Sequence, residues 1–230
     1  MAKRKLEKFE QIGQMPNVFQ NFHWRDAQLI NYQQQKINLK GNWNKDFFQN
    51  NNPIVLELAC GYGEYTVAIA KSQAQTNVIG IDIKGNRLWK GAKELLEQQF
   101  NNAAFVRTTI NLLPHFFAPN EVQQIWLTFP DPQNQSGSQN KRLTSSMFID
   151  IYRQIMPKNG IIHLKTDSTL LYDFTLSIIE QKKCKIINQI FDLYQSELYK
   201  DNDLLQTTTR YEKLNLSKAD TIKYLSFEIG

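Results

Sequence analysis

The pattern of apolar and polar positions is most regular from Pro53 onward, where short apolar runs alternate with amphipathic segments. The apolar runs, at residues 54–59, 77–82, 103–108, 122–129 and 160–166, have the length of strands. The amphipathic segments, at residues 64–73, 87–100, 144–156 and 168–181, predict helices. Strands that are apolar throughout are typical of a parallel sheet buried on both faces. We therefore predict an open, doubly wound α/β domain.

Both ends of the chain depart from this alternation. Residues 184–194 and 221–229 predict two further strands with no convincing helix signal between them, which indicates an antiparallel pair at the sheet edge. The expected sheet is then seven-stranded and mostly parallel, with antiparallel C-terminal strands. Within the polar first fifty residues, 24–35 predict a short helix. The asparagine-rich segment 49–53 predicts a linker between an N-terminal arm, residues 1–50, and a main domain, residues 51–230.

Composition narrows the class of protein. With 230 residues and 41% hydrophobic content, the chain can bury one large core. No apolar run approaches the ~20 residues that a membrane span needs. The N-terminus also lacks the apolar segment of a signal peptide. The two cysteines and three histidines show no metal-ligand spacing, so we expect a cytoplasmic protein with reduced thiols and no metal site.

The net charge of +5 and a pI of about 9.1 give a mild basic excess. Part of this excess is local, because the first nine residues hold four cations against the single acid Glu7: Lys3, Arg4, Lys5 and Lys8. Such a cluster is either a solvated, frayed terminus or an arm that contacts phosphate. Composition alone leaves both interpretations open.

The carboxyl ends of the predicted strands are where a doubly wound sheet binds its ligands. Four of the five parallel strands carry an acid at or just beyond that end: Glu57, Asp82, Asp131 and Asp167. Gly61 and Gly63 follow the first strand, in a turn where glycine lets a ligand approach the backbone closely. The same turn also serves as a tight connection in many proteins without a ligand there.

The glycine turn and the first two acids favour one cofactor over another. Ala59 fills the first glycine position of GxGxxG, and Glu57 would repel a pyrophosphate, so a dinucleotide cradle is poorly supported. Glu57 suits a cationic group such as an α-ammonium. Asp82, about twenty residues after the glycines, suits a ribose diol, although it could also cap the helix that begins near Gly85. An ammonium anchor and a ribose anchor without a phosphate site describe S-adenosylmethionine better than NAD.

The stretch "LTFPDPQNQSGSQNKRLTSS", residues 127–146, places Asp131 between two prolines and ends its polar part on Lys141 and Arg142. Proline on both sides restricts the backbone around the acid, which would hold a carboxylate in a fixed position. Taken in isolation, an Asp-Pro pair is more often the start of a turn. We expect Lys141 and Arg142 to contact phosphate.

Six motifs in order, "LELACGYGEY", "IGIDIKGNRLWKGAK", "LTFPDPQ", "NKRLTS", "GIIHLKTDS" and "TRYEKL", resemble the bacterial tRNA (guanine-N7)-methyltransferase family. The resemblance runs from about Pro53 to the C-terminus, and FPDP followed by KRLT and HLKTD is specific to that family. It implies a Rossmann-like class I methyltransferase domain over residues 51–230. It also implies that S-adenosylmethionine contacts Glu57, Asp82 and Asp131, with Asp131 as the catalytic residue near the transfer site.

The resemblance further implies tRNA as substrate, the variable-loop guanine as target, and substrate contacts by Asp167, Thr209, Arg210, Tyr211 and Glu212. Three positions depart from the family pattern. Asn111 falls near a family acid and could accept from the adenine amino group, Gln133 replaces a common tryptophan, and Gln135 replaces a substrate-binding lysine. These changes bear on the strength of RNA contact more than on the chemistry.

The chemistry implied needs no general base, because guanine N7 carries a lone pair and no proton. Asp131 and Asp167 could accept from guanine N1–H and its exocyclic amine, which would select the base and orient N7.

Several alternatives stand beside this interpretation. Asp167 could cap the helix that begins at Ser168, Tyr211 could be ordinary core, and the four tryptophans are expected to pack rather than stack on bases. At the level of the whole protein, the alternatives are a catalytically silent RNA-binding module and an NAD-dependent oxidoreductase.

Overall fold

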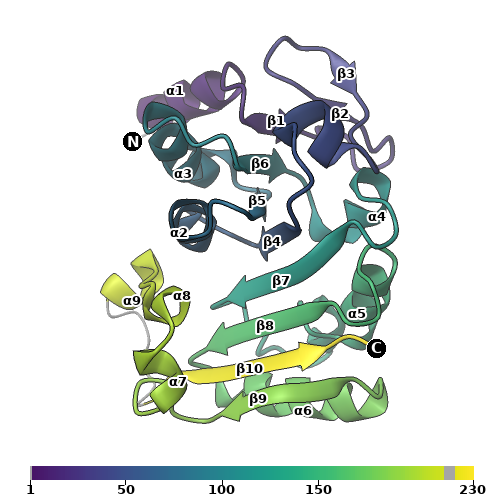
Figure 1. The fold of residues 1–230 in the computed structure, drawn as a ribbon, viewed down its shortest axis with the longest axis vertical. Helices are drawn as coiled ribbons and strands as arrows, with labels where there is room; N and C mark the ends of the chain where they lie inside the picture. The colour runs from purple at the N-terminus through teal and green to yellow at the C-terminus, as the bar shows by residue number, and fades with distance from the viewer. Residues whose placement is uncertain (1, 215–220) are drawn as a thin grey trace.

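The apolar runs form the centre of a ten-stranded sheet with the order β3-β2-β1-β6-β5-β4-β7-β8-β10-β9 (Figure 1). The structure, a computed structural model, describes residues 2–214 and 221–230. Its strands are β1 Val18–Gln20, β2 Leu29–Ile30, β3 Lys36–Ile37, β4 Ile54–Leu58, β5 Asn77–Asp82, β6 Ala103–Arg107, β7 Val122–Thr128, β8 Ile161–Thr166, β9 Lys185–Ile190 and β10 Lys223–Glu228.

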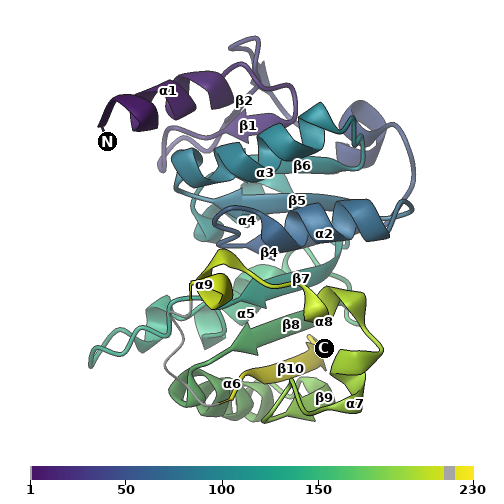
Figure 2. The same cartoon turned by 90° about the vertical axis from the view of Figure 1, so that its left-hand side faces the viewer.

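The helices lie mostly where amphipathic segments predict them. The α-helices are α1 Ala2–Ile12, α2 Glu64–Ser72, α3 Gly85–Glu97, α4 Leu113–Phe116, α5 Ser146–Arg153, α6 Thr169–Gln181, α7 Glu197–Lys200, α8 Asp203–Gln206 and α9 Arg210–Lys213. A π-helical turn, η1 Trp43–Phe48, and two 3₁₀ turns, η2 Ile110–Leu112 and η3 Gln139–Lys141, complete the set. Helices α2 and α3 contact β5 and β6, whereas α6 contacts β8 and β10 from the opposite side (Figures 1 and 2).

The five central strands, β6-β5-β4-β7-β8, are parallel to one another. All five residues of β4 and all six of β5 are buried, as expected for strands covered on both faces. Strand β10 lies antiparallel between β8 and the edge strand β9. The prediction of a mostly parallel sheet with antiparallel C-terminal strands is therefore confirmed, with β4 to β10 as its seven strands.

The predicted helix over residues 24–35 is wrong. This region contains bends and the short strand β2, and three short strands from the N-terminal region extend the sheet beyond β6. Side-chain acceptors explain the difference, because the Asn21 carboxamide accepts from the backbone N–H groups of His23 and Gln28. Asn31 accepts from the N–H groups of Gln33 and Gln35 in the same way. Such local bonds compete with a helix for backbone donors.

Three helices of four residues each, α7 to α9, lie between β9 and β10, where the sequence shows no convincing helix signal. Each begins at a side-chain cap, Ser196, Asn202 or Thr209, whose oxygen accepts from backbone N–H groups of the first turn. They lie beside the ends of β8 and β10 in Figure 1. The chain thereby builds a wall over the carboxyl end of β8.

The N-terminal helix α1 packs on α3. Ile12 is fully buried, and Gly85 leaves room for it, because a Cβ atom there would lie 2.6 Å from Ile12 Cδ1. The Lys8 ammonium lies 4.4 Å from the Trp89 ring centroid on α3. The N-terminal helix is therefore docked rather than frayed, and its contact with phosphate stays a prediction.

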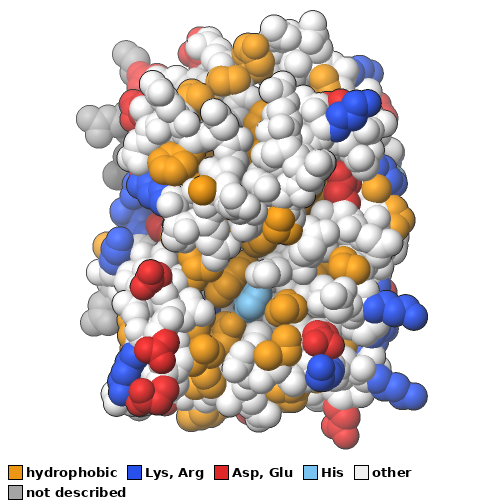
Figure 3. Space-filling view, viewed as in Figure 1, with side chains coloured by type: hydrophobic (Ala, Val, Ile, Leu, Met, Phe, Trp, Pro, Cys, Tyr) orange, Lys and Arg blue, Asp and Glu red, His pale blue; other side chains and the backbone are white. Residues whose placement is uncertain are grey.

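On the side of the sheet that faces the viewer in Figure 1, none of the described helices covers β8 and β10, and apolar side chains gather across the middle of that face in Figure 3. Nowhere in the described chain is a helix both long and apolar enough to span a bilayer. Within the same residues, no three His, Cys, Asp or Glu side chains cluster as metal ligands would.

Candidate active site

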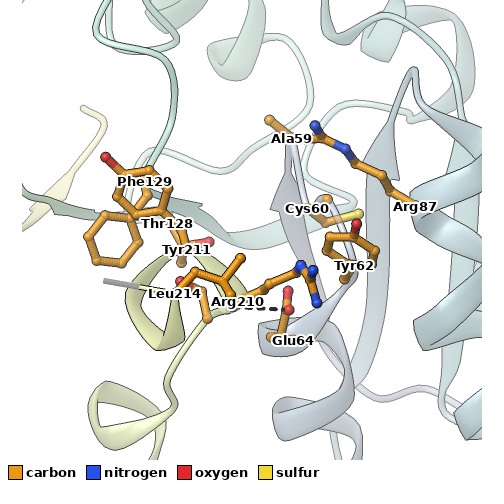
Figure 4. Close-up of a pocket in the computed structure, with 12 residues that line it drawn as sticks. Ala59, Cys60, Tyr62, Glu64, Arg87, Thr128, Phe129, Arg210, Tyr211 and Leu214 are labelled. Carbon is orange, nitrogen blue, oxygen red and sulfur yellow. Dashed lines mark hydrogen bonds between the residues drawn. The ribbon is translucent and has the colours of Figure 1, made fainter. Parts of the chain in front are cut away.

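Two adjoining hollows open at the carboxyl ends of the central strands. The larger, about 730 Å³, is lined by Asp82, Ile83, Lys84, the segment 130–132, Asn134, Asp167 and Ser168. The smaller, about 270 Å³, lies between the glycine turn and the segment 209–211 (Figure 4). Ala59, Arg87, Phe129 and Tyr211 line both. Ligand sites commonly measure about 300–1,000 Å³, so the larger hollow has the size of a nucleoside-type site.

The glycine turn after β4 is shaped by left-handed backbone at Ala59, Gly61 and Gly63, with φ of 54°, 57° and 74°. Gly63 also has no room for a side chain, because a Cβ atom would lie 2.6 Å from the Phe105 ring. Gly61 N donates to Asp82 Oδ2 at 2.9 Å, which ties the turn to the end of β5. The turn therefore presents its backbone to the hollows while the neighbouring strand holds it in place.

Asp82 lines the larger hollow at the end of β5. Its second carboxylate oxygen accepts from Lys84 N at 2.8 Å, and Lys84 is itself the N-cap residue of α3. No side chain caps α3, so capping does not account for Asp82. Each of its oxygens retains acceptor capacity that a diol could use.

Glu57 lies beneath the glycine turn and lines neither hollow. Its Oε2 accepts from Thr66 N at 2.7 Å and from Thr66 Oγ1 at 2.6 Å, which fixes the first turn of α2. Burial raises the pKa of the Glu57 carboxyl from 4.5 to about 8, so that it is mostly neutral at pH 7. Its expected contact with the cofactor stays a prediction.

Asp131 reaches the larger hollow from the turn after β7. Its Oδ1 accepts from Gln133 N at 2.9 Å, so the acid does form an Asx turn as well as facing the hollow. Phe129 and Gln133 flank this turn with φ of 48° and 49°, a conformation that non-glycine residues adopt at a cost of about 1–3 kcal/mol each. Such backbone strain is commonly retained where a side chain must be held for function.

Arg142 is buried and braces the turn that carries Asp131. Its Nε donates to the Pro132 carbonyl at 2.9 Å, and its guanidinium carbon lies 4.4 Å from the Phe174 ring centroid. The expectation that Arg142 contacts phosphate is therefore wrong, because only 5% of the residue is exposed. Lys141, by contrast, is exposed at the end of the turn η3.

Asp167 and Tyr211 form the opposite wall. The Tyr211 hydroxyl donates to Asp167 Oδ2 at 2.9 Å, and both line the larger hollow. Ser168 caps α6 by accepting from Leu171 N, so Asp167 is not needed as a cap. Tyr211 is half-buried, with its ring 5.4 Å from that of Phe129, and is not ordinary core.

Arg210 extends from α9 toward the glycine turn. Its backbone N donates to Glu64 Oε1 at 3.2 Å, drawn as a dashed line in Figure 4, and its guanidinium carbon lies 5.3 Å from the Tyr62 ring centroid. Arg87, which the sequence interpretation did not single out, lies across the same hollow in Figure 4. These two exposed guanidiniums are positioned to meet an anionic substrate.

Thr209 and Glu212 form a capping box at the start of α9, and Glu212 also pairs with Lys165. Glu212 Oε1 lies 2.8 Å from Lys165 Nζ, and both side chains are buried. Lys165 also donates to the carbonyls of Leu205 and Thr207. Sequence reasoning missed Lys165, although a lysine inside the apolar run "GIIHLKT" was a signal that a buried partner exists.

Asn111 is exposed on η2 and lines neither hollow. The structure thus brings Asp82, Asp131 and Asp167 together with Thr209, Arg210 and Tyr211 around the hollows. Cys60 also lines the smaller hollow, but burial raises the pKa of its thiol well above the usual range, which disfavours a nucleophilic thiolate. The site is suited to hold and orient a ligand rather than to attack it.

Comparison with known proteins identifies the family. Residues 51–225 match a family model described as "Putative methyltransferase". The chain is 43% identical to the tRNA (guanine-N(7)-)-methyltransferase of Bacteroides fragilis over 227 residues, 99% of this chain and 86% of that protein. It is 41% identical to the protein of the same name from Christiangramia forsetii, covering 99% of each chain. The chain belongs to the tRNA (guanine-N7)-methyltransferase family.

Solved structures share the fold of this family member at low sequence identity. A 16S rRNA methyltransferase, KamB, superposes with a TM-score of 0.61 at 11% identity, covering 85% of this chain and 96% of that one. A methyltransferase from Aquifex aeolicus described as SAM-dependent gives a TM-score of 0.53 at 11% identity, covering 77% and 82%. The predicted methyltransferase fold and the resemblance are confirmed, and the NAD-dependent oxidoreductase is no longer supported.

Proposed function

We propose that this protein transfers a methyl group from S-adenosylmethionine to N7 of a guanine in tRNA, in the variable loop. The observation that supports this most strongly is the meeting of Asp82, Asp131 and Asp167 around one hollow, beside a glycine turn, in a chain of this family. Capping accounts for neither Asp82 nor Asp167. Several polar groups converging on one sheet edge indicate a ligand site.

The residues at the ends of β4 and β5 fit the cofactor. Asp82 would hold the ribose hydroxyls, and the backbone of the glycine turn would lie against the remainder of the ligand. Glu57, beneath the turn, would stabilise positive charge there once ionised. Asn111, which lies outside both hollows, would reach the adenine side only of a ligand that extends past the end of β6. S-adenosylmethionine supplies an electrophilic methyl group on a sulfonium when bound.

The guanine would lie in the larger hollow between Asp131 and Asp167. Their carboxylates accept from guanine N1–H and the exocyclic amine, and Tyr211 fixes the orientation of Asp167 through its hydroxyl. Guanine N7 has no proton to lose, so the residues need only orient the base. Proximity and alignment of this kind can contribute roughly 7–11 kcal/mol.

The RNA around the guanine would contact exposed cations and the segment 209–212. Arg210 is free to contact phosphate, whereas Thr209 and Glu212 act by holding α9 in place through the capping box and Lys165. Residues 1–50 would serve as the RNA-binding arm and residues 51–230 as the catalytic domain. A tRNA substrate would place the enzyme in the cytoplasm.

The test is transfer of a labelled methyl group from S-adenosylmethionine to a tRNA transcript, followed by nucleoside analysis. We expect 7-methylguanosine, and no transfer to a transcript made with 7-deazaguanosine, which lacks the accepting nitrogen. Equal labelling of both transcripts would show that another atom is the target. Binding of both ligands without any transfer would identify a silent RNA-binding module.

A further inference from the structure

Five consecutive residues after β1, Phe22 to Asp26, are exposed, and two of them are aromatic. Trp24 is 68% exposed and Phe22 is 52% exposed. The expectation that all four tryptophans pack is therefore wrong for Trp24, although Trp43 and Trp126 are buried. Two large aromatic side chains left in water two positions apart are not accounted for by packing.

The loop that carries them is held at its base. Asn21 N donates to the Arg107 carbonyl at 2.9 Å, and Asn21 Nδ2 donates to Thr108 Oγ1 at 3.3 Å. The Asn21 carboxamide oxygen accepts from the N–H groups of His23 and Gln28, which closes the loop. Phe22 and Trp24 are thus presented from a defined loop at the end of a strand.

This loop lies at the same sheet edge as the candidate active site. Strand β1 runs parallel to β6, and β6 runs parallel to β5, so all three end at one edge. Arg107, at the end of β6, is the register partner of Asp82. Its Nε donates to the carbonyl of Ile83, which lines the larger hollow. The surface is therefore continuous from the hollow through Ile83 and Arg107 to the loop.

Guanidinium groups accompany the aromatic rings. The Arg25 guanidinium carbon lies 4.5 Å from the Trp24 ring centroid, and that of Arg107 lies 5.6 Å from the Phe22 ring centroid. A hollow of about 500 Å³ separates Phe22 from α1, with Arg107, Gln20 and Gln34 among its lining residues. Exposed rings for stacking, with arginine for the backbone, are the combination by which proteins bind unpaired nucleotides.

We propose that Phe22, Trp24, Arg25 and Arg107 form a stacking platform for an unpaired nucleotide of tRNA next to the target guanine. This inference rests on the proposed function. The pairing of each ring with a cation favours a polyanion over a second copy of this basic chain, because like charges would then meet across the interface. Trp24, the more exposed ring, would carry the stack.

The test compares Trp24→Ala and Trp24→Phe with Tyr32→Ala, a control that removes an exposed ring from the turn after β2. We expect Trp24→Ala to raise the KM for tRNA roughly five- to fifty-fold, the scale of one lost base–aromatic stack, with kcat and cofactor affinity largely kept. Trp24→Phe should recover most of the loss, and Tyr32→Ala should match the wild type. Arg25→Ala should reduce the dependence of tRNA affinity on salt, whereas Trp24→Ala should leave that dependence unchanged.

Tryptophan fluorescence separates failure of the platform from failure of the proposed function. Single-stranded RNA should quench the wild type more than Trp24→Phe, whether or not the protein methylates tRNA. A wild type that methylates tRNA with an unchanged KM in Trp24→Ala would overturn the platform. So would a change in oligomeric state of Trp24→Ala in sedimentation, because it would assign this surface to a second copy.

Discussion

At the scale of single residues, burial separates acids that look alike in the sequence. Glu57 is 1% exposed, and burial raises the pKa of its carboxyl to about 8. Asp131 is exposed to the hollow and accepts one backbone hydrogen bond. Glu57 is therefore suited to support the glycine turn from inside, with a charge that depends on the bound ligand. Asp131 is suited to accept hydrogen bonds from a ligand in the hollow. The sequence predicts that both acids belong to the site. How deeply each side chain is buried depends on packing, which no local sequence pattern encodes.

Replacing Glu57 by Gln should change how stability depends on pH. The folded pKa of about 8 lies above the unfolded value of 4.5, so the native state retains a proton that the unfolded state releases. The stability from this group is complete below pH 4.5 and is lost as pH rises toward 8, by at most about 1.4 kcal/mol per unit. Urea unfolding between pH 5 and 8 should show the ligand-free wild type losing stability relative to Glu57→Gln. The same slope in both proteins would contradict the assignment, and the exposed Glu97→Gln serves as control.

Asp131→Asn tests orientation apart from binding. Asparagine retains an oxygen for the Gln133 N–H, so the turn should survive, while the negative charge proposed to face the guanine is lost. We expect a fold and a tRNA affinity close to wild type, with single-turnover methyl transfer reduced by about 10²-fold or more. The residual rate should show no new dependence on a catalytic base, because guanine N7 has no proton. A wild-type transfer rate with pre-bound tRNA would leave Asp131 as a turn residue only.

At the scale of elements, the sequence predicts those strands and helices whose positions follow from the periodicity of apolar residues. Each central strand and each of α2, α3, α5 and α6 lies where the pattern indicates, because a buried face requires that pattern. The helices α7 to α9, of four residues each, are too short to show that periodicity, and a side-chain cap starts each of them. Lys165 on β8 holds the end of α8 from about forty residues away in sequence, by donating to the carbonyls of Leu205 and Thr207. Side chains from separate segments create this part of the site.

Lys165→Met should therefore destabilise the wall of the site. It leaves the Glu212 carboxylate buried without its partner, a change that typically costs about 3–5 kcal/mol. Adding Glu212→Gln removes the stranded charge while an amide oxygen still accepts from Thr209 N, so the double variant should regain most of the stability. Urea unfolding of the single and double variants measures this coupling. Equal losses in both would show that the pair does not hold α9.

At the scale of the whole molecule, parallel strands collect the functional groups at one edge. Residues at the ends of β4, β5, β7 and β8 line the hollows. The exposed loop 22–26, which follows β1, lies beside them next to the end of β6. Helix α1 packs on α3, close to Gly85 at the start of α3, just after the end of β5. Arg87, Arg107 and Arg210 lie at this edge, so part of the net charge of +5 is directed toward it.

The salt dependence of tRNA binding tests whether cations at this edge of the sheet contact the RNA. Removing Lys3, Arg4 and Lys5 together by alanine keeps good helix formers in α1, so the docked helix should persist. If all three cations neutralise phosphates, the slope of log affinity against log salt should become shallower by about two to three, since each contact contributes about 0.7–0.9. Alanine at Lys45 and Lys158, which lie on segments preceding β4 and β8 and so at the opposite edge, should leave the slope unchanged. Equal slopes in the wild type and the triple variant would show that the N-terminal helix serves packing and that the RNA lies elsewhere on this edge.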